Sequence, residues 1–246
     1  MNNSSLSERA DAEMPLLEIS KITKYFGFPA LSNVDIQIQE GDRFGLIGPN
    51  GSGKTTLMNI ITGLLAADGG KILFKSEDIS SLPAYKRARM GIARTFQVPK
   101  PFNSLSVVDN LSVPLRNANQ AKEKVDSLEI LRLLRIDSKA EAKPGELTQI
   151  ELRKLELARA LVQNPTLLLL DEAMAGLTGV EIDEMLKILE NLSEQGISIL
   201  MIEHIMKAVM SFSRKIVVLN AGMKIAEGRP EEILNNKEVE RAYLGE

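Results

Sequence analysis

The 246-residue sequence contains no cysteine, which excludes disulfide bonds, zinc-thiolate sites and thiol nucleophiles. This composition fits a reducing compartment. Neither sign of charge is in large excess, because 30 lysine and arginine residues stand against 33 aspartate and glutamate residues. Without a basic excess, the sequence predicts no nucleic-acid partner.

Long apolar runs are also missing. No run approaches the roughly 18 residues that a membrane-spanning helix needs, and the polar first fourteen residues lack the apolar centre of a signal peptide. We therefore expect a protein of the cytosol, with any membrane role exerted through a partner. Residues 1–14 are expected to form a flexible tail, and Met14 is an alternative start of the chain.

The sequence does contain alternating apolar strands and amphipathic helices, which indicate an α/β fold with a parallel sheet covered on both faces. Residues 98–146, broken by prolines that include Pro114, are interpreted as a mostly helical insertion. The helix after residue 54 is expected to carry the apolar stripe Leu57, Ile60, Ile61 and Leu64, with Gly63 near its end. The expected strands are 16–20, 34–39, 43–48, 166–171, 197–202, 215–220 and 223–228. Another helix is expected to start near residue 106, and three more are expected to span 121–135, 149–163 and 180–194.

A glycine-rich loop between a predicted strand and a predicted helix is the most specific motif. It reads Gly48, Pro49, Asn50, Gly51, Ser52, Gly53, Lys54, Thr55 and Thr56, which matches the phosphate-loop pattern G-x-x-x-x-G-K-[ST]. Its glycines let successive backbone N–H groups point at phosphate oxygens. Lys54 supplies a charge for the β- and γ-phosphates, and the Thr55 hydroxyl is a ligand for Mg²⁺.

Polar residues follow three other apolar runs. Asp171 and Glu172 end a buried strand, where Asp171 is expected to face the metal and Glu172 to act as general base on the attacking water. His204, the single histidine, follows the apolar run 197–202, at the edge of the sheet where ligands bind. Gln97 ends the run 92–96.

In this order, the residues resemble the ATPase subunit of ATP-binding cassette (ABC) transporters over residues 15–246, most closely the branched-chain amino acid uptake type. The closer likeness is carried by the strings GIARTFQ (91–97), DEAMAGLT (171–178), IEHIMKAVM (202–210) and AYLGE (242–246). The resemblance implies a P-loop NTPase core of residues 15–97 and 161–246, an N-terminal antiparallel β region, and a helical subdomain at about 98–160. Subunits for urea, other amides or lipopolysaccharide share parts of these strings.

The resemblance also implies roles for individual residues. Gln97 contacts Mg²⁺ or the attacking water and couples the site to the membrane partner, while His204 contacts the γ-phosphate. Phe26 stacks on adenine, with Tyr25 as the alternative. Gln97 and the insertion form a groove for a short helix of the permease. Two ATPase subunits close head to tail, and each completes the nucleotide site of the other.

Two segments depart from the family pattern. The signature, usually Leu-Ser-Gly-Gly-Gln, reads Leu147, Thr148, Gln149, Ile150 and Glu151 here. Ile150 places a branched side chain where bare backbone usually approaches the partner's γ-phosphate, and Glu151 adds a negative charge there. Thr148 with Glu151 also forms the pattern of a helix-capping box. Thr178, where the family mostly has Asp or Asn, forms the same pattern with Glu181.

We thus predict the ATP- and Mg²⁺-dependent subunit of an importer at the cytoplasmic face of the membrane. Its predicted partners are permease subunits, a different second ATPase subunit in preference to a second copy, and, indirectly, an extracytoplasmic binding protein. A weakly catalytic regulatory subunit is an alternative, because the signature is altered. A soluble DNA-repair or ribosome-associated ATPase is disfavoured by the single cassette, the missing heptad arm and the missing basic patch.

Overall fold

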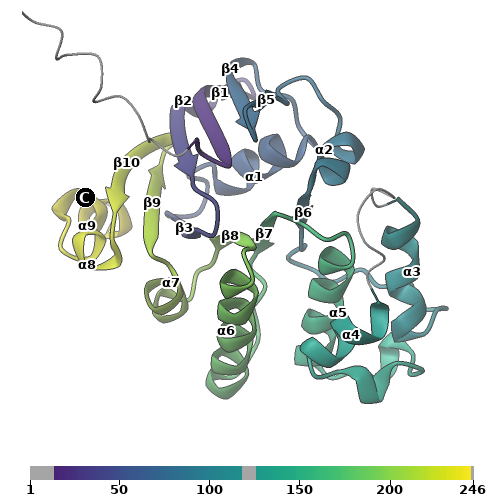
Figure 1. Cartoon of the computed structure of the whole chain (residues 1–246). Coiled ribbons are helices and arrows are strands. Elements are labelled where there is room, and N and C mark those ends of the chain that lie inside the picture. The colour runs from purple at the N-terminus through teal and green to yellow at the C-terminus, as the bar shows by residue number, and fades with distance from the viewer. Residues whose placement is uncertain (1–13, 118–125, 245–246) are drawn as a thin grey trace, which may run out of the picture.

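The computed structural model describes residues 14–117 and 126–244. The predicted tail, apart from Met14, and residues 121–125 of the predicted helix 121–135 lie outside the described residues. Two sheets with helices packed around them organise the described chain (Figure 1). This arrangement confirms the predicted α/β fold with an N-terminal antiparallel region, a mainly parallel sheet and helices inserted between its strands.

The smaller sheet is antiparallel and has the strand order β2-β1-β4-β5. The burial of Val34, Ile36 and Ile38 and the exposure of Asp35 and Gln37 confirm the predicted half-buried strand. The strand was nevertheless predicted too short, because it begins at Pro29. The strands are β1 Leu17–Tyr25, β2 Pro29–Ile38, β4 Gly69–Phe74 and β5 Glu77–Asp78.

The larger sheet has the order β10-β9-β3-β8-β7-β6, and every neighbouring pair except β10 with β9 is parallel. β7 and β8 are buried along their whole length, as the continuous apolar runs predicted. The carboxyl ends of β3, β6, β7 and β8 consequently lie along one edge. The strands are β3 Arg43–Ile47, β6 Ile92–Arg94, β7 Leu167–Asp171, β8 Ser198–Ile202, β9 Lys215–Asn220 and β10 Met223–Gly228.

Helix α1, Lys54–Thr62, fills the space between the two sheets. Its buried side chains include Leu57, Ile60 and Ile61 of the predicted apolar stripe. The prediction for Leu64 was wrong: Gly63 ends the helix in a left-handed conformation (φ 75°), and Leu64 beyond it is 55% exposed. Helix α2, Ala84–Met90, was not predicted.

Between β6 and β7 the chain forms helices α3 Val107–Asn117, α4 Ser127–Leu133 and α5 Gln149–Leu161, with two short 3₁₀ turns before α5. The predicted helix 121–135 was too long within the described residues, because the carboxylate of Asp126 caps α4 by accepting the N–H of Leu128. Pro114 does not break the chain as predicted but lies inside α3. Packing of buried Val107 and Leu111 stabilises α3 despite the missing proline N–H.

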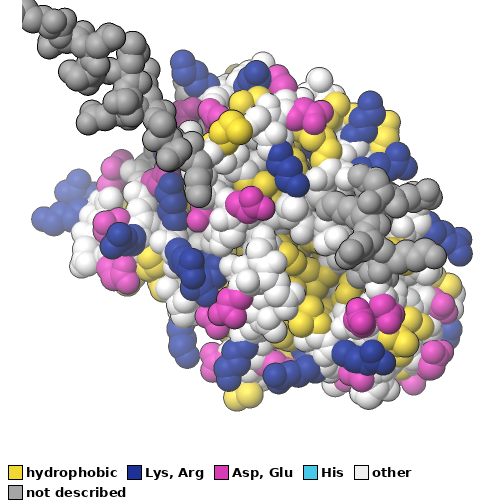
Figure 2. Space-filling model, viewed as in Figure 1, with side chains coloured by type: hydrophobic (Ala, Val, Ile, Leu, Met, Phe, Trp, Pro, Cys, Tyr) yellow, Lys and Arg dark blue, Asp and Glu magenta, His cyan; other side chains and the backbone are white. Residues whose placement is uncertain are grey.

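Helices α6 Gly179–Glu194 and α7 Met206–Phe212 cover the face of the large sheet that is turned away from the small one, and α8 Pro230–Leu234 and α9 Lys237–Leu244 pack near its β10 edge. On the face seen in Figure 2, basic and acidic side chains are interspersed, with hydrophobic side chains between them. In the part of the chain that the structure describes, no helix has both the length and the apolar character needed to cross a membrane.

Candidate functional site

The phosphate loop connects β3 to α1, and at two of its positions only glycine fits. At Gly48 (φ 148°), an added Cβ would lie 2.0 Å from the carbonyl oxygen of Leu219, and at Gly53 (φ 103°) it would lie 2.7 Å from that of Ala30. Both glycines are therefore required by close backbone approach, and by backbone angles that side chains disfavour. With glycine at both positions, the loop packs closely against the backbone at Leu219 and Ala30.

Lys54 is buried at the first position of α1, where its ammonium group donates to the carbonyl oxygens of Gly48 (2.7 Å) and Pro49 (2.9 Å). Burial lowers the pKa of Lys54, and the nearby negative charges of Glu172 and Asp171 oppose that change. Two carbonyl oxygens are modest partners for a buried ammonium group, so a phosphate dianion is a stronger acceptor for the same charge.

A cavity of about 260 Å³ opens in front of the loop. Four segments far apart in the sequence meet there. Of the two aromatic candidates, Phe26 lines the cavity, and Phe28, which sequence reasoning missed, lies beside it with ring centroids 6.5 Å apart. The lining residues are Phe26, Phe28, Ala30, Asn50, Gly51, Ser52, Gly53, Lys54, Thr55, Thr56, Glu172 and His204.

The three predicted catalytic side chains meet at one carboxylate. His204 Nε2 lies 2.8 Å from Oε1 of Glu172, and Gln97 Nε2 donates to Oε2 of Glu172 at 2.5 Å. Glu172 follows β7, Gln97 follows β6 and His204 follows β8, so the parallel sheet itself brings the three together. Glu172 has a left-handed backbone (φ 50°), a strained conformation that is common at functional sites.

Asp171 has a partner that sequence reasoning missed. Its Oδ2 accepts a hydrogen bond of 2.6 Å from Arg94 on β6, and both side chains are 7% exposed. The other arm of the guanidinium donates to Oδ1 of Asn59 on α1, also at 2.6 Å. Arg94 therefore links the phosphate-loop helix to the end of β7, and it leaves Oδ1 as the Asp171 oxygen for a further ligand.

The signature segment lies outside this cavity. Thr148 accepts the N–H of Glu151, and Oε2 of Glu151 accepts the N–H of Thr148 at 2.7 Å, which confirms the predicted capping box. The same N–H lowers the pKa of Glu151. Thr178 and Glu181 form the second predicted box at the start of α6. The charge of Glu151 is therefore directed at its own helix end.

Arg153, one turn further along α5, was also missed. Its guanidinium donates to the carbonyl oxygens of Gln97 and Ala175. The amide of Gln149 donates to Ala175 as well, at 3.3 Å. Helix α5 is thus attached to the segments that contain Gln97 and Glu172.

Comparison with known proteins agrees with this geometry. The family model described as ABC transporter matches residues 31–175, which is more than half of the chain. The chain belongs to the ABC transporter family. As a member it is an ATP-binding subunit whose ATPase activity serves transport. A second family model, described as branched-chain amino acid ATP-binding cassette transporter, matches residues 223–246.

Similar ABC proteins span almost the whole chain. The probable branched-chain amino acid transport ATP-binding protein LivG of Archaeoglobus fulgidus is 36% identical, covering 94% of this chain and 96% of its own length. The corresponding BraF protein of Pseudomonas aeruginosa is 37% identical, covering 94% and 98%. A crystal structure of an ABC transporter cassette in its ADP conformation is 34% identical, with a TM-score of 0.85 and coverage of 95% and 100%.

If the phosphates of ATP lie at the phosphate loop, we expect Lys54→Ala to weaken ATP affinity by ~2–4 kcal/mol, since a desolvated phosphate charge loses its nearest cation. Calorimetric titration of the isolated chain with ATP measures the loss. Lys207→Ala removes an exposed lysine from α7 and serves as the control. Equal affinity of Lys54→Ala and the parent for ATP would contradict the placement of phosphate at this loop.

Proposed function

We propose that the chain is the ATP-hydrolysing subunit of an importer for branched-chain amino acids, attached to its permease at the cytoplasmic face of the membrane. The convergence of Gln97 and His204 on Glu172, beside the phosphate loop, is the observation that carries the hydrolytic role. The match of residues 223–246 to the branched-chain family and the names of the relatives support the substrate class.

In this proposal Glu172 is the general base. Its two carboxylate oxygens are oriented by His204 and Gln97. When either of these neighbours moves to its own ligand, the carboxylate oxygen that it releases turns toward an attacking water. His204 then contacts the γ-phosphate. Lys54 transfers its hydrogen bonds from the loop carbonyls to phosphate, and the ring of Phe26 stacks on adenine.

The donors for Mg²⁺ fit its chemistry. In the described residues no cluster of three or more His, Cys, Asp or Glu side chains forms a ready-made cage, and Mg²⁺ usually takes one or two protein oxygens together with phosphates. Thr55 is exposed in the cavity. Asp171 and Gln97 are not among its lining residues, but Asp171 precedes Glu172 in the chain and the Gln97 amide donates to Glu172. When bound, the ion neutralises charge that develops on the phosphate oxygens.

The membrane partner is proposed to dock beside Gln97. A cavity of about 490 Å³ lies between the segment after Gln97 and the turn before α5, and exposed Val98 and Phe102 add apolar surface nearby. Its lining residues are Pro99, Lys100, Pro101, Asn103, Pro144, Gly145 and Leu152. A permease helix here would touch the backbone of the loop whose Gln97 side chain bonds to Glu172.

Purification of the tagged chain from its native membrane tests the proposal. We expect two permease subunits and a second, different ATPase subunit to copurify, and branched-chain amino acids to stimulate ATP hydrolysis when the matching binding protein is present. Stimulation by urea, by another amide or by lipopolysaccharide instead would reassign the substrate. Recovery without any permease would contradict the transport role.

The second ATPase subunit is proposed to be a different chain, because Ile150 and Glu151 alter the signature while the phosphate loop and Glu172 keep the pattern. A missing donor to the γ-phosphate costs ~3 kcal/mol of transition-state stabilisation. We therefore expect the isolated chain to hydrolyse ATP on the order of 10²-fold more slowly than the assembled transporter, and we expect Ile150→Gly with Glu151→Gln to restore part of that rate.

Steady-state ATPase rates of parent and double variant, each alone and reconstituted, measure this effect. Because Glu151 also caps α5, the helix content of the double variant is checked by circular dichroism. A fast isolated parent, or a folded double variant that is no faster than the parent, would contradict the asymmetric pairing. A slow parent that stays slow in the reconstituted transporter would favour the weakly catalytic regulatory subunit.

A further inference from the structure

Glu203 is a buried acidic residue that the proposed chemistry does not use. It lies one residue beyond β8, between that strand and His204, and it is 3% exposed. Its Oε1 accepts a hydrogen bond of 2.8 Å from the backbone N–H of Met174. Met174 is two residues past Glu172, so the carboxylate of Glu203 binds the turn that presents the general base.

That turn needs to be held. Glu172 is in the left-handed region (φ 50°), which a residue with a side chain occupies only when its surroundings enforce it. The N–H of Glu172 donates to the carbonyl oxygen of Ile202 at 2.9 Å. This bond and the bond from Met174 to Glu203 connect the end of β8 to the turn on both sides of Ala173. Only the second of these bonds depends on a side chain.

We propose that Glu203 is a positioning residue for Glu172, with its carboxylate fixing the backbone of the 172–175 turn so that the base faces the attacking water. The proposal rests on the role of Glu172 given above. It assigns to Glu203 no contact with nucleotide, and it predicts an effect on the rate of hydrolysis rather than on ATP binding.

The charges around Glu203 make this positioning sensitive to pH. Burial raises the pKa of Glu203 to about 7, and the negative charge of Glu172 adds to that effect. The N–H groups of Met174 and His204 and the His204 side chain oppose it, and the guanidinium of Arg153 on α5 also faces it. As pH rises through this value, Glu203 ionises, becomes a stronger acceptor for Met174, and adds negative charge beside the base. Both changes favour hydrolysis.

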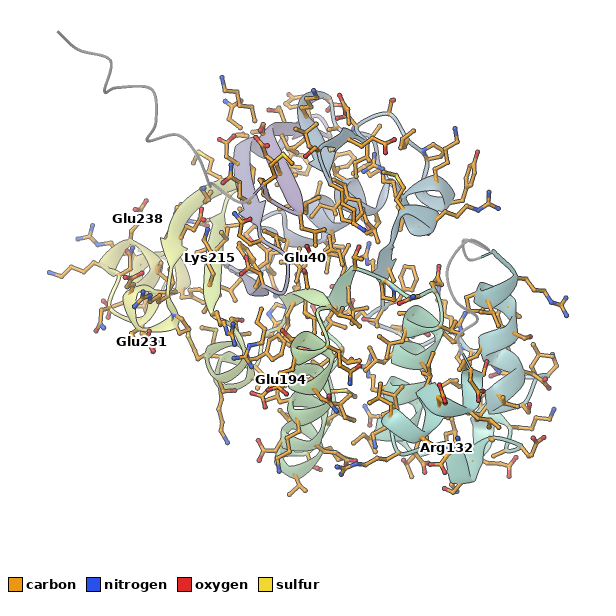
Figure 3. All side chains as sticks on the ribbon, in the orientation of Figure 1. Glu40, Arg132, Glu194, Lys215, Glu231 and Glu238 are labelled. Atoms are coloured by element: carbon orange, nitrogen blue, oxygen red, sulfur yellow. The ribbon has the colours of Figure 1, made fainter. Side chains whose placement is uncertain are left out.

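Two variants separate the contributions of the acceptor and the charge. Glu203→Leu removes the acceptor, and we expect kcat to fall by ~10- to 100-fold, the range for a slightly misplaced catalytic group, with KM for ATP changed less than about threefold. Glu203→Gln keeps an oxygen for Met174 but cannot ionise. The ratio of parent to Glu203→Gln activity is expected to rise from about 1 at pH 6 to about 5 at pH 8. Glu40→Gln, an exposed control (Figure 3), is expected to leave kcat and the KM for ATP unchanged.

Amide hydrogen exchange of Met174, followed by NMR, reports the positioning without any ATPase assay. We expect its protection to fall by more than about tenfold in Glu203→Leu and to persist in Glu203→Gln. Unchanged protection in Glu203→Leu, or a parent-to-Gln activity ratio that is flat with pH, overturns the role of Glu203. If Glu203→Leu loses this protection but the parent chain never hydrolyses ATP, even when assembled, the proposed function is contradicted instead. If Glu203→Leu does not fold, the pH ratio of Glu203→Gln decides.

Discussion

Glu172→Gln is expected to lower the rate of ATP hydrolysis by about 10²- to 10⁴-fold, the usual contribution of a general base, while ATP binding is retained. The amide keeps the shape of the side chain and still offers one oxygen to His204 or Gln97, whose nitrogens lie 2.8 and 2.5 Å from the native carboxylate. It cannot accept a proton from water. The chemical step is therefore removed without loss of the phosphate contacts of Lys54.

The same variant is expected to accumulate as a closed dimer with ATP, because hydrolysis no longer reopens it. Light scattering with and without ATP detects the doubled mass in the chain reconstituted with its partner subunit. Glu194→Gln changes an exposed glutamate at the far end of α6 (Figure 3) and controls for the loss of charge. Hydrolysis by Glu172→Gln at the parent rate would show that Glu172 is not the base.

Arg94→Met is expected to lower the free energy of unfolding by ~3–5 kcal/mol, the range for removing one partner of a buried ion pair. The substitution leaves the carboxylate of Asp171 without its partner at 7% exposure and also breaks the bond to Asn59. The volume of the side chain is nearly conserved, so the loss reports the charge and its hydrogen bonds more than a cavity.

Urea denaturation followed by circular dichroism measures this loss. Arg132→Met, an exposed arginine on α4 (Figure 3), is the matched control and is expected to change the free energy of unfolding by less than about 0.5 kcal/mol. A loss below about 1 kcal/mol for Arg94→Met would mean that the pair is as weak as an exposed one. The link that Arg94 makes between α1 and β7 would then contribute little to the free energy of unfolding.

The sequence was most informative where the chemistry is local. The phosphate loop, the apolar strand before Asp171 and both capping boxes are patterns within ten residues, so they were predicted together with the elements that contain them. Leu64 shows the limit of periodicity: it continues the apolar stripe of α1, but Gly63 adopts φ 75° and ends the helix first. A glycine at a helix end therefore outweighs one further apolar residue.

Contacts between distant segments could not be predicted in the same way. Arg94 and Asp171 are 77 positions apart, and Glu203 and Met174 are 29 apart. Nothing in the local sequence of either residue indicates its partner. The order of the parallel strands decides these contacts, because β6, β7 and β8 end side by side. Phe28 was missed for a similar reason, since the turn between β1 and β2 determines which aromatic residue faces the cavity.

A crystal structure of the Glu172→Gln chain with ATP and Mg²⁺ tests the central claim most directly, namely that the cavity at the phosphate loop holds the nucleotide to be hydrolysed. The account predicts that Lys54 leaves the carbonyl oxygens of Gly48 and Pro49 for the β- and γ-phosphates, and that adenine lies on Phe26. It also predicts that the amide that replaces the Glu172 carboxylate lies beside the γ-phosphate. Nucleotide bound elsewhere, or Lys54 still bonded to the two carbonyls with ATP present, would contradict it.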